Sequence, residues 1–392
     1  MKEVNEKRVR HASFKELLVQ IRLRTFNFIK RNVVMVIALI LASITCFIVP
    51  PDKEYLSYFD FKTLSCLFTV LAVVCALKNI KFFYIIARKI VSVFKTARVS
   101  VLALIYITFL GSMLIANDMA LLTFLPLGFF VLHSTGKEKY MPFTFIMQNI
   151  AANLGGMLTP FGNPQNLYLY SFFKIPTLEF MGIMLPSFIL SVLLITVCCL
   201  IFVKGEVLEI QNEEVKLPPV RTAIYLVLFL VSILIVFRGI PYIVGLILIP
   251  LVLIFMDRRA LAKVDYLLLL TFVFFFIFAG NMARIDAVKD FFGFLLEKDT
   301  LIFSTLSCQI ISNVPSAILL SQFASNYREL LIGVNIGGVG TLISSLASLI
   351  TLREYISHNP KGAIKYILKF SAFNFGFLFI LLIFNLLWLW IF

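Results

Sequence analysis

The fold is decided by the stretch Leu114-Ile115-Ala116-Asn117-Asp118-Met119-Ala120, in which an amide and a carboxylate interrupt an apolar run. A second interruption, Ser312-Asn313-Val314-Pro315, follows roughly 200 residues later in another apolar run. Polar side chains and freed backbone groups are costly at membrane depth unless they line a protected cavity. Because each half of the chain carries one interruption, the pair predicts a substrate or ion site of a secondary transporter.

Composition places the chain in a bilayer. Its 392 residues are 60% hydrophobic and only 14% charged, which excludes an ordinary soluble domain. The net charge of +14 does not indicate nucleic-acid binding, because Lys and Arg gather between apolar runs, as they do in cytoplasmic loops. The six cysteines lie in apolar segments without metal-ligand spacing, so we expect neither disulfides nor a metal cluster.

Nine apolar segments are expected to cross the membrane, each close to the roughly 17–25 residues that a bilayer requires. They cover residues 33–49, 60–77, 142–173, 178–203, 221–237, 241–256, 264–280, 330–352 and 364–391. The runs 97–132 and 299–325 instead predict re-entrant hairpins, because their polar breaks leave arms of only about 13–18 residues. The alternative is a pair of short complete spans joined by a tight turn.

The predicted fold is an all-α integral membrane protein, an inverted-repeat transporter with two re-entrant helical hairpins and broken transmembrane helices. The expected parts are a basic cytoplasmic segment (1–32), a first repeat (33–203), a connecting loop with an extra transmembrane helix (204–240) and a second repeat (241–392). Asp60 and Asp265 open corresponding spans, and an amphipathic segment typical of an in-plane helix follows each span.

The distribution of basic residues and the odd number of membrane crossings predict how the chain is oriented in a plasma or inner membrane. Basic residues before the first span place the N-terminus in the cytoplasm, and the odd number of crossings places Phe392 outside. Each repeat has four crossings, so the extra span between them inserts the second repeat upside down.

Breaks inside two spans supply the second part of the predicted site. The stretch Thr159-Pro160-Phe161-Gly162-Asn163-Pro164-Gln165-Asn166 combines two prolines, a glycine and three amides, so the helix must unwind there. Its counterpart from Gly337 to Ser348 is rich in glycine and hydroxyl groups but lacks proline, which leaves open whether it unwinds fully. Close packing through small residues equally explains its glycines and the pair Gly155-Gly156.

Half-helix N-termini at such tips and breaks present unpaired N–H groups to an anion, and freed carbonyls can coordinate Na⁺. Neither candidate site, made of a hairpin tip and a broken span, contains Arg or Lys. A bound anion therefore needs a co-bound cation to offset its charge. We expect coupling to Na⁺ or H⁺ and no other cofactor. Asp118 can take up that proton or cation and can also cap the following helix, and one carboxylate can do both. The candidate substrate-binding residues are Asn117, Asp118, Thr159, Gly162, Asn163, Pro164, Asn166, Ser312, Asn313, Thr341, Ser344, Ser345 and Ser348.

The order of hairpin, broken span and inverted copy resembles the ion transporter superfamily of divalent anion/sodium symporters, citrate permeases, ArsB-type arsenite permeases and NhaD-type antiporters. The Ser-Asn-Thr tips of the symporters correspond to Ala116-Asn117-Asp118 and Ser312-Asn313-Val314, where both asparagines remain but the hydroxyls at Ala116, Asp118 and Val314 are lost. The symporter Gly-Thr-Pro-Pro-Asn break resembles residues 162–166. The stretch 341–348 is similar to the arsenite permease pattern. The resemblance implies an elevator movement in a homodimer. It also implies the candidate ion-binding residues Ser112, Ala116, Asn117, Asp118, Gly162, Cys308 and Asn313. The thiol of Cys308 is a poor sodium ligand.

Three functions remain open. The first is a cation-coupled carrier of small anions such as di- and tricarboxylates or oxyanions including arsenite. For such a carrier the charge of Asp118 disfavours a dicarboxylate, and a neutral oxyacid such as arsenite is easier to accommodate. The second is a Na⁺/H⁺ antiporter that exchanges ions at Asp118 and needs no organic ligand. The third is a membrane-embedded enzyme or a scaffold. The sequence offers neither a nucleophile paired with a base nor a phosphate-binding loop, so we expect no enzyme. The expected partners are a small anionic or oxyacid substrate, the lipid bilayer and a second copy of the chain, but no nucleic acid.

Overall fold

The computed structural model describes residues 19, 22, 32–208 and 217–391. The basic segment predicted over residues 1–32 therefore lies almost wholly outside the described residues. Within them the chain is helical, with a single isolated β-bridge between Thr96 and Val207. The prediction of an all-α fold is confirmed for this part of the chain.

The elements of the first half and the connecting helix follow in this order: α2 (Val33–Ile48), the 3-10 helix η1 (Lys53–Tyr58), α3 (Phe61–Asn79), α4 (Phe82–Ser92), α5 (Ala97–Ile115), α6 (Asn117–Ser134), η2 (Glu138–Tyr140), α7 (Met141–Gly155), η3 (Gly156–Leu158), α8 (Pro164–Phe172), α9 (Thr177–Phe202) and α10 (Pro219–Val236).

The second half repeats that order: α11 (Tyr242–Met256), α12 (Arg258–Ala262), α13 (Tyr266–Ala283), α14 (Asp286–Lys298), α15 (Thr300–Ile311), α16 (Asn313–Leu320), α17 (Tyr327–Ile336), α18 (Leu346–His358), η4 (Pro360–Gly362) and α19 (Ala363–Ile391). Asp60 and Asp265 cap α3 and α13, because the Oδ1 of each accepts a backbone N–H three residues on, at 3.0 and 2.9 Å. The expectation that these two residues open corresponding helices is confirmed.

Seven helices in the described part of the chain are long and apolar enough to cross a membrane, namely α3, α5, α6, α9, α10, α13 and the final helix from Pro360 to Ile391. The shorter apolar helices α2, α11 and α15 add to them. The two spans expected over 142–173 and 330–352 are both broken, into α7 with α8 and α17 with α18. The protein is therefore a multi-pass membrane protein.

The arms of the first hairpin lie at the upper end of the expected length. Its arms α5 and α6 have 19 and 18 residues, and each is long enough to cross a membrane alone. Pro126 lies inside α6 without ending it. The second hairpin has arms of 12 and 8 residues, both shorter than expected.

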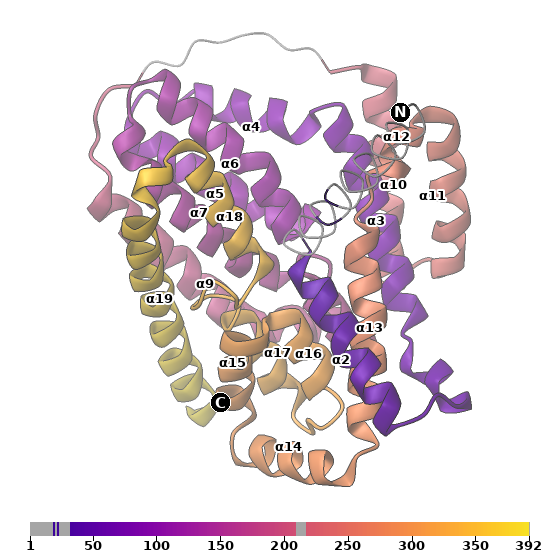
Figure 1. The fold of residues 1–392 in the computed structure, drawn as a ribbon. Helices are drawn as coiled ribbons and strands as arrows, with labels where there is room; N and C mark the ends of the chain where they lie inside the picture. Colours follow the sequence, from indigo (N-terminus) through magenta and orange to yellow (C-terminus); the bar gives the residue numbers. More distant parts are fainter. Residues whose placement is uncertain (1–18, 20–21, 23–31, 209–216, 392) are drawn as a thin grey trace, which may run out of the picture.

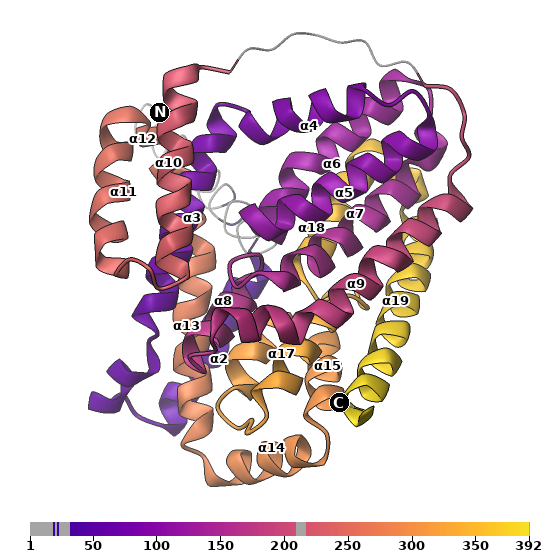
Figure 2. The same ribbon diagram turned by 180° about the vertical axis from the view of Figure 1, so that it is seen from behind.

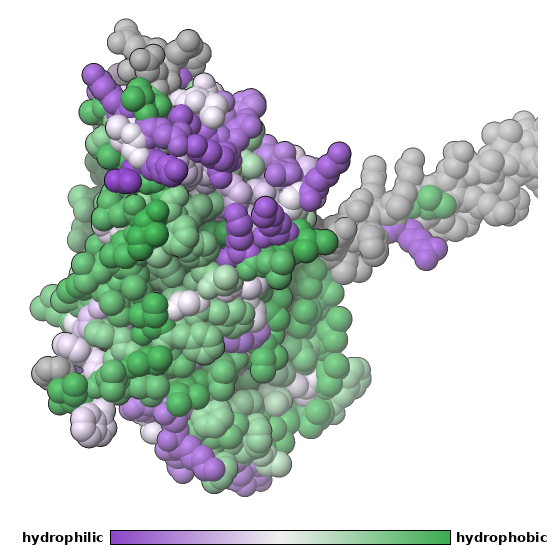
Figure 3. Space-filling view, turned by 90° about the vertical axis from the view of Figure 1, so that its left-hand side faces the viewer, coloured by the Kyte–Doolittle hydropathy of each residue, from purple (hydrophilic) through white to green (hydrophobic). Residues whose placement is uncertain are grey.

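The two halves of the chain approach the centre of the molecule from opposite ends. Helix α4 lies across one end and α14 across the other, and the hairpins α5–α6 and α15–α16 extend inward from these ends (Figures 1 and 2). Helix α2 packs along α13, and α11 packs along α3, so the first helix of each half contacts the other half. On the face that carries α19, an apolar band separates the polar residues gathered at the two ends (Figure 3), as a membrane-crossing surface requires.

Candidate functional site

Both hairpins turn through the same unusual backbone conformation. Ala116 has φ 64° and ψ 151°, and Ser312 has φ 75° and ψ 159°, a region that residues other than glycine rarely occupy. In each hairpin the next residue is an asparagine, Asn117 or Asn313, whose side-chain oxygen accepts the following backbone N–H at 2.9 Å. The structure thus builds the two tips as copies of one turn.

Each tip is attached to the break of its own half. The backbone N–H of Asn117 donates to the carbonyl of Gly162 at 3.1 Å, and that of Asn313 donates to the carbonyl of Ser344 at 2.9 Å. The residue after each acceptor, Asn163 or Ser345, is extended and starts the second part of its broken helix. Tip and break therefore form one unit in each half.

The second break is complete although it lacks proline. Helix α17 ends at Ile336 and α18 begins at Leu346. Gly340 has φ 131°, and a Cβ there would lie 2.1 Å from Oε1 of Gln309, so the turn requires glycine. Gln309 donates to the carbonyls of Gly337 and Val339 at 2.9 and 3.3 Å and accepts the N–H of Thr341 at 2.9 Å. One amide thus satisfies the backbone groups that unwinding frees.

Asn166 has the matching task in the first break. Its Nδ2 lies 3.1, 3.3 and 3.4 Å from the carbonyl oxygens of Gly156, Met157 and Thr159. The side chain is fully buried and faces the unwound segment, so it replaces the hydrogen bonds that the prolines remove. Asn166 therefore holds the break open, and it does not line the central cavity.

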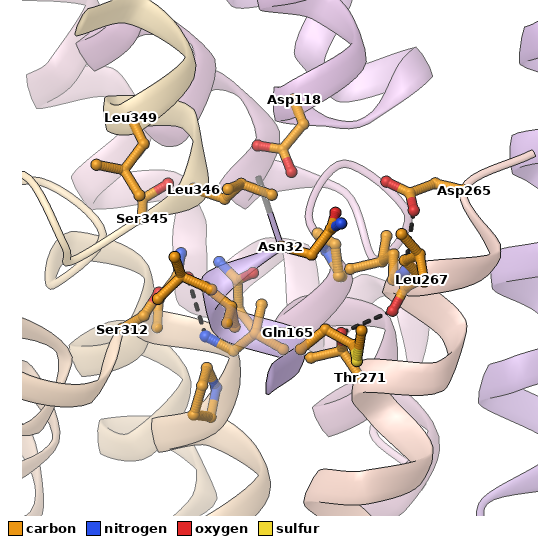
Figure 4. A pocket seen from close by; sticks show the side chains of 18 of the residues that line it. Asn32, Asp118, Gln165, Asp265, Leu267, Thr271, Ser312, Ser345, Leu346 and Leu349 are labelled. Carbon is orange, nitrogen blue, oxygen red and sulfur yellow. Dashed lines mark hydrogen bonds between the residues drawn. The ribbon is translucent and has the colours of Figure 1, made fainter. Parts of the chain in front are cut away.

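Both tips and both breaks meet at one cavity of about 130 Å³ (Figure 4). Its size lies below the roughly 300–1,000 Å³ of most small-molecule sites, which favours a small solute. Helices α2 and α13 complete its walls. Six of the candidate substrate-binding residues line it: Asn117, Asp118, Pro164, Ser312, Asn313 and Ser345.

The other candidates do not line this cavity. Thr159 donates to the carbonyl of Met113 at 2.8 Å, Thr341 donates to that of Gln309 at 3.1 Å, and Ser344 donates to that of Gly338 at 2.9 Å. Ser348 is fully buried, and its hydroxyl has no hydrogen-bond partner among the described residues. The remaining candidates away from this cavity are Gly162, Asn163 and Asn166 and, from the ion-binding set, Ser112, Ala116 and Cys308.

Ser112 and Cys308 occupy corresponding positions one turn before the tips, and each faces a glycine. A Cβ on Gly155 would lie 2.7 Å from Oγ of Ser112, and a Cβ on Gly337 would lie 2.9 Å from Sγ of Cys308. These glycines therefore permit close helix packing. Ala116 lines a second cavity of about 80 Å³, which shares Asn117, Asp118 and Pro164 with the larger one.

The cavity contains charged residues that sequence reasoning did not assign to the site. The expectation that no Arg or Lys lies there is wrong, because Arg353 of α18 is part of the wall. Ser345, Leu349 and Arg353 are spaced by four residues and so share one face of the helix. That spacing is the signal by which the sequence places Arg353 on the site.

Two carboxylates from different halves face the same cavities. Asp118 and Asp265 line both, and Oδ1 of Asp118 is buried without a hydrogen-bond partner among the described residues. Asp265 caps α13, whereas the side chain of Asp118 caps no helix. Of the two roles left open for Asp118, the capping role is therefore wrong. The Oε1 of Gln165, buried and likewise without a partner in the described structure, lies on the wall of the larger cavity.

A network of buried amides joins the two halves behind the tips. Oδ1 of Asn153 accepts from Nδ2 of Asn117 at 3.3 Å and from Oγ of Ser345 at 2.8 Å. Asn335 accepts from Asn163 at 3.3 Å and donates to Asn166 at 2.7 Å. Sequence reasoning missed both central asparagines, although the pattern Asn-x-Gly-Gly occurs at residues 153–156 and again at 335–338.

Comparison with known proteins agrees with this architecture. The model of a family described as citrate transporter matches residues 21–329. An uncharacterized transporter of Methanocaldococcus jannaschii is 37% identical over 297 residues, which cover 75% of this chain and 81% of that protein. The inner membrane protein YbiR of Escherichia coli is 29% identical over 318 residues, or 78% of this chain and 83% of that protein. The predicted resemblance is confirmed, and the chain belongs to the citrate transporter family.

Proposed function

We propose that this protein is a cation-coupled secondary transporter of small anions such as di- and tricarboxylates or oxyanions. The observation that carries the proposal is the convergence of two matched tips and two breaks on one cavity beside Asp118, whose Oδ1 is buried and unpaired within the described structure. Membership of the citrate transporter family supports transport of an anion.

The cavity offers groups of both kinds that coupled transport needs. For an anion it has the N-terminal ends of α6 and α16, the amide of Asn313 and the positive charge of Arg353. For a cation it has the carboxylates of Asp118 and Asp265 and the oxygen of Gln165. Na⁺ prefers oxygen ligands, and a proton would neutralise one of the carboxylates. Two carboxylates in a low-dielectric cavity repel an anion unless a cation binds with it, which is the basis of coupling.

The movement that we propose is of the elevator type, with the hairpins and broken helices moving as one body. The hydrogen bonds of Asn153 and Asn335 support it, because they join the moving parts of both halves. The proposal further includes re-entrant hairpins, a cytoplasmic N-terminus, an external C-terminus and a homodimer. These features follow from charge, parity and the family resemblance.

A second candidate function is Na⁺/H⁺ antiport with Asp118 as the exchanging group. The Oδ1 of Asp118 favours it, because a buried carboxylate oxygen without a partner among the described residues binds either a proton or a metal cation. Efflux of a neutral oxyacid such as arsenite fits the small cavity for the same reason, since an uncharged solute leaves the carboxylates undisturbed.

Transient currents of proteoliposomes on a solid-supported membrane test the proposal. Succinate, citrate and arsenite are applied in Na⁺ or choline and at two pH values to wild type, Asp118→Asn and the matched control Asp290→Asn, which removes an exposed carboxylate of α14. We expect a substrate-dependent current, or matching tracer uptake, that requires Na⁺ or H⁺ and is lost only in Asp118→Asn. No response to any anion, with Na⁺ pulses that shift the luminal pH in wild type alone, would establish the antiporter instead.

A further inference from the structure

A groove at the periphery of the molecule combines lysines with an aromatic floor. It has a volume of about 430 Å³ and lies between the start of α7, the end of α9 and the first half of α19. Its walls include Lys139, Lys204 and Lys369 together with three phenylalanines, Phe143, Phe202 and Phe373. We propose that this groove binds one anionic phospholipid, with the phosphate between the lysines and the first acyl carbons on the phenylalanines.

The three phenylalanines form a continuous apolar surface. Their ring centroids lie 5.5 Å apart for Phe143 and Phe202, 5.6 Å for Phe143 and Phe373, and 5.1 Å for Phe202 and Phe373. Phe202 remains 52% exposed although it is aromatic and packed on two rings. Exposed aromatic surface of this kind is stable against acyl chains and costly against water.

The charge of the groove is positive and only partly neutralised. Lys139 contacts Oε1 of Glu206 at 2.5 Å, and the same carboxylate accepts from Lys137 at 2.8 Å and from the hydroxyl of Tyr140 at 3.0 Å. Glu206 therefore already accepts from three donors, two of them charged. The ammonium groups of Lys204 and Lys369 are exposed and form no ion pair with any described residue. An anion in the groove meets two positive charges that no described residue neutralises.

The position of the groove selects a lipid among possible anions. Helices α9 and α19 pack together and carry exposed apolar side chains beside it, such as Ile201 at 69% and Leu368 at 67%. The face that carries α19 changes from the apolar band to polar residues towards the end where α4 lies (Figures 1 and 3). Basic pockets between transmembrane helices at such a boundary bind anionic headgroups, because the phosphate stays hydrated while the chains stay in hydrocarbon.

The bound lipid would contact both halves of the chain, since α7 and α9 belong to the first and α19 to the second. This inference does not depend on which solute the central cavity carries. We expect the protein to prefer anionic headgroups because of the lysines in the groove, and not because of the net positive charge of the whole chain.

Native mass spectrometry of the purified full chain in detergent tests the inference, with phosphatidylglycerol and phosphatidylcholine of equal chain length as probes. The test variant is the double substitution Lys204→Ala with Lys369→Ala. The control is Lys361→Ala with Lys365→Ala, which removes two exposed charges from η4 and the first turn of α19 but none from the groove. We expect one phosphatidylglycerol bound about tenfold more tightly than phosphatidylcholine, a preference lost in the test variant and kept in the control.

A third variant, Phe202→Ser, probes the acyl contact and is expected to weaken both lipids without changing their ratio. Equal loss in the two double variants would overturn the inference, because it would make the binding a matter of net charge. Displacement of the lipid by inorganic phosphate at the same concentration would also overturn it and would assign the lysines to a soluble anion.

Discussion

Replacing Asn153 with alanine removes the acceptor that two side chains of different halves share. Oδ1 of Asn153 accepts from Nδ2 of Asn117 at 3.3 Å and from Oγ of Ser345 at 2.8 Å, and all three residues are at least 96% buried. Each buried donor left unpaired costs about 1–3 kcal/mol. The Ser345 hydroxyl can rotate to relieve part of this, so we expect the free energy of unfolding to fall by about 2–4 kcal/mol.

A double-mutant cycle separates the inter-half hydrogen bond from the rest of the effect. The free energies of unfolding of wild type, Asn153→Ala, Ser345→Ala and the double variant are measured in mixed detergent micelles by SDS titration. A buried neutral hydrogen bond contributes about 0.5–1.5 kcal/mol, so the coupling energy should fall in that range. The control cycle pairs Asn153→Ala with Ser316→Ala, a buried serine that bonds to Ser307 instead, and should give a coupling near zero.

The reasoning is refuted if Asn153 and Ser345 contribute independently. A coupling energy indistinguishable from that of the control cycle would mean that the two halves are not joined at this point. It would also remove the main structural support for a single moving body.

Three further predictions concern the turns and the loop after α9. Gly340→Ala should lower the free energy of unfolding by about 1–3 kcal/mol, because φ is 131° there. The control Gly376→Ala, at a glycine of α19 with open space around it, should be neutral or stabilising. Thermal unfolding measures both variants. Ala116→Gly should raise stability by up to about 1 kcal/mol because it relieves a positive φ; a decrease would show that this turn is not strained. Lys137 and its neighbours lower the pKa of Glu206 from 4.5 to about 2. The stabilisation is therefore complete above pH 4.5 and is lost as the pH falls toward 2, so the melting-temperature gap between wild type and Glu206→Gln should shrink between pH 6 and 3. A gap that does not change with pH would contradict this assignment.

The protein's elements were predictable because the membrane leaves few alternatives. Backbone groups in hydrocarbon must be paired within a segment, so apolar length marks the helices and polar interruptions mark where they end. Asn117 and Asn313 identified the two tips, and Pro164 identified the first break. The sequence leaves the second break open because the segment lacks proline and because close helix packing explains its glycines equally well. Its actual cause is Gly340 with Gln309, a residue in the preceding hairpin arm.

Sequence alone determined the class of protein, the helix order, the two tips and the family. These properties depend on local hydropathy and on short motifs. Only the tertiary structure decided which polar residues share a cavity. Asp265 reaches it from a helix more than 140 residues away from Asp118, and Asn153 meets Ser345 across 192 positions. Contacts of this kind depend on how the two halves of the chain pack, and no local pattern encodes that packing.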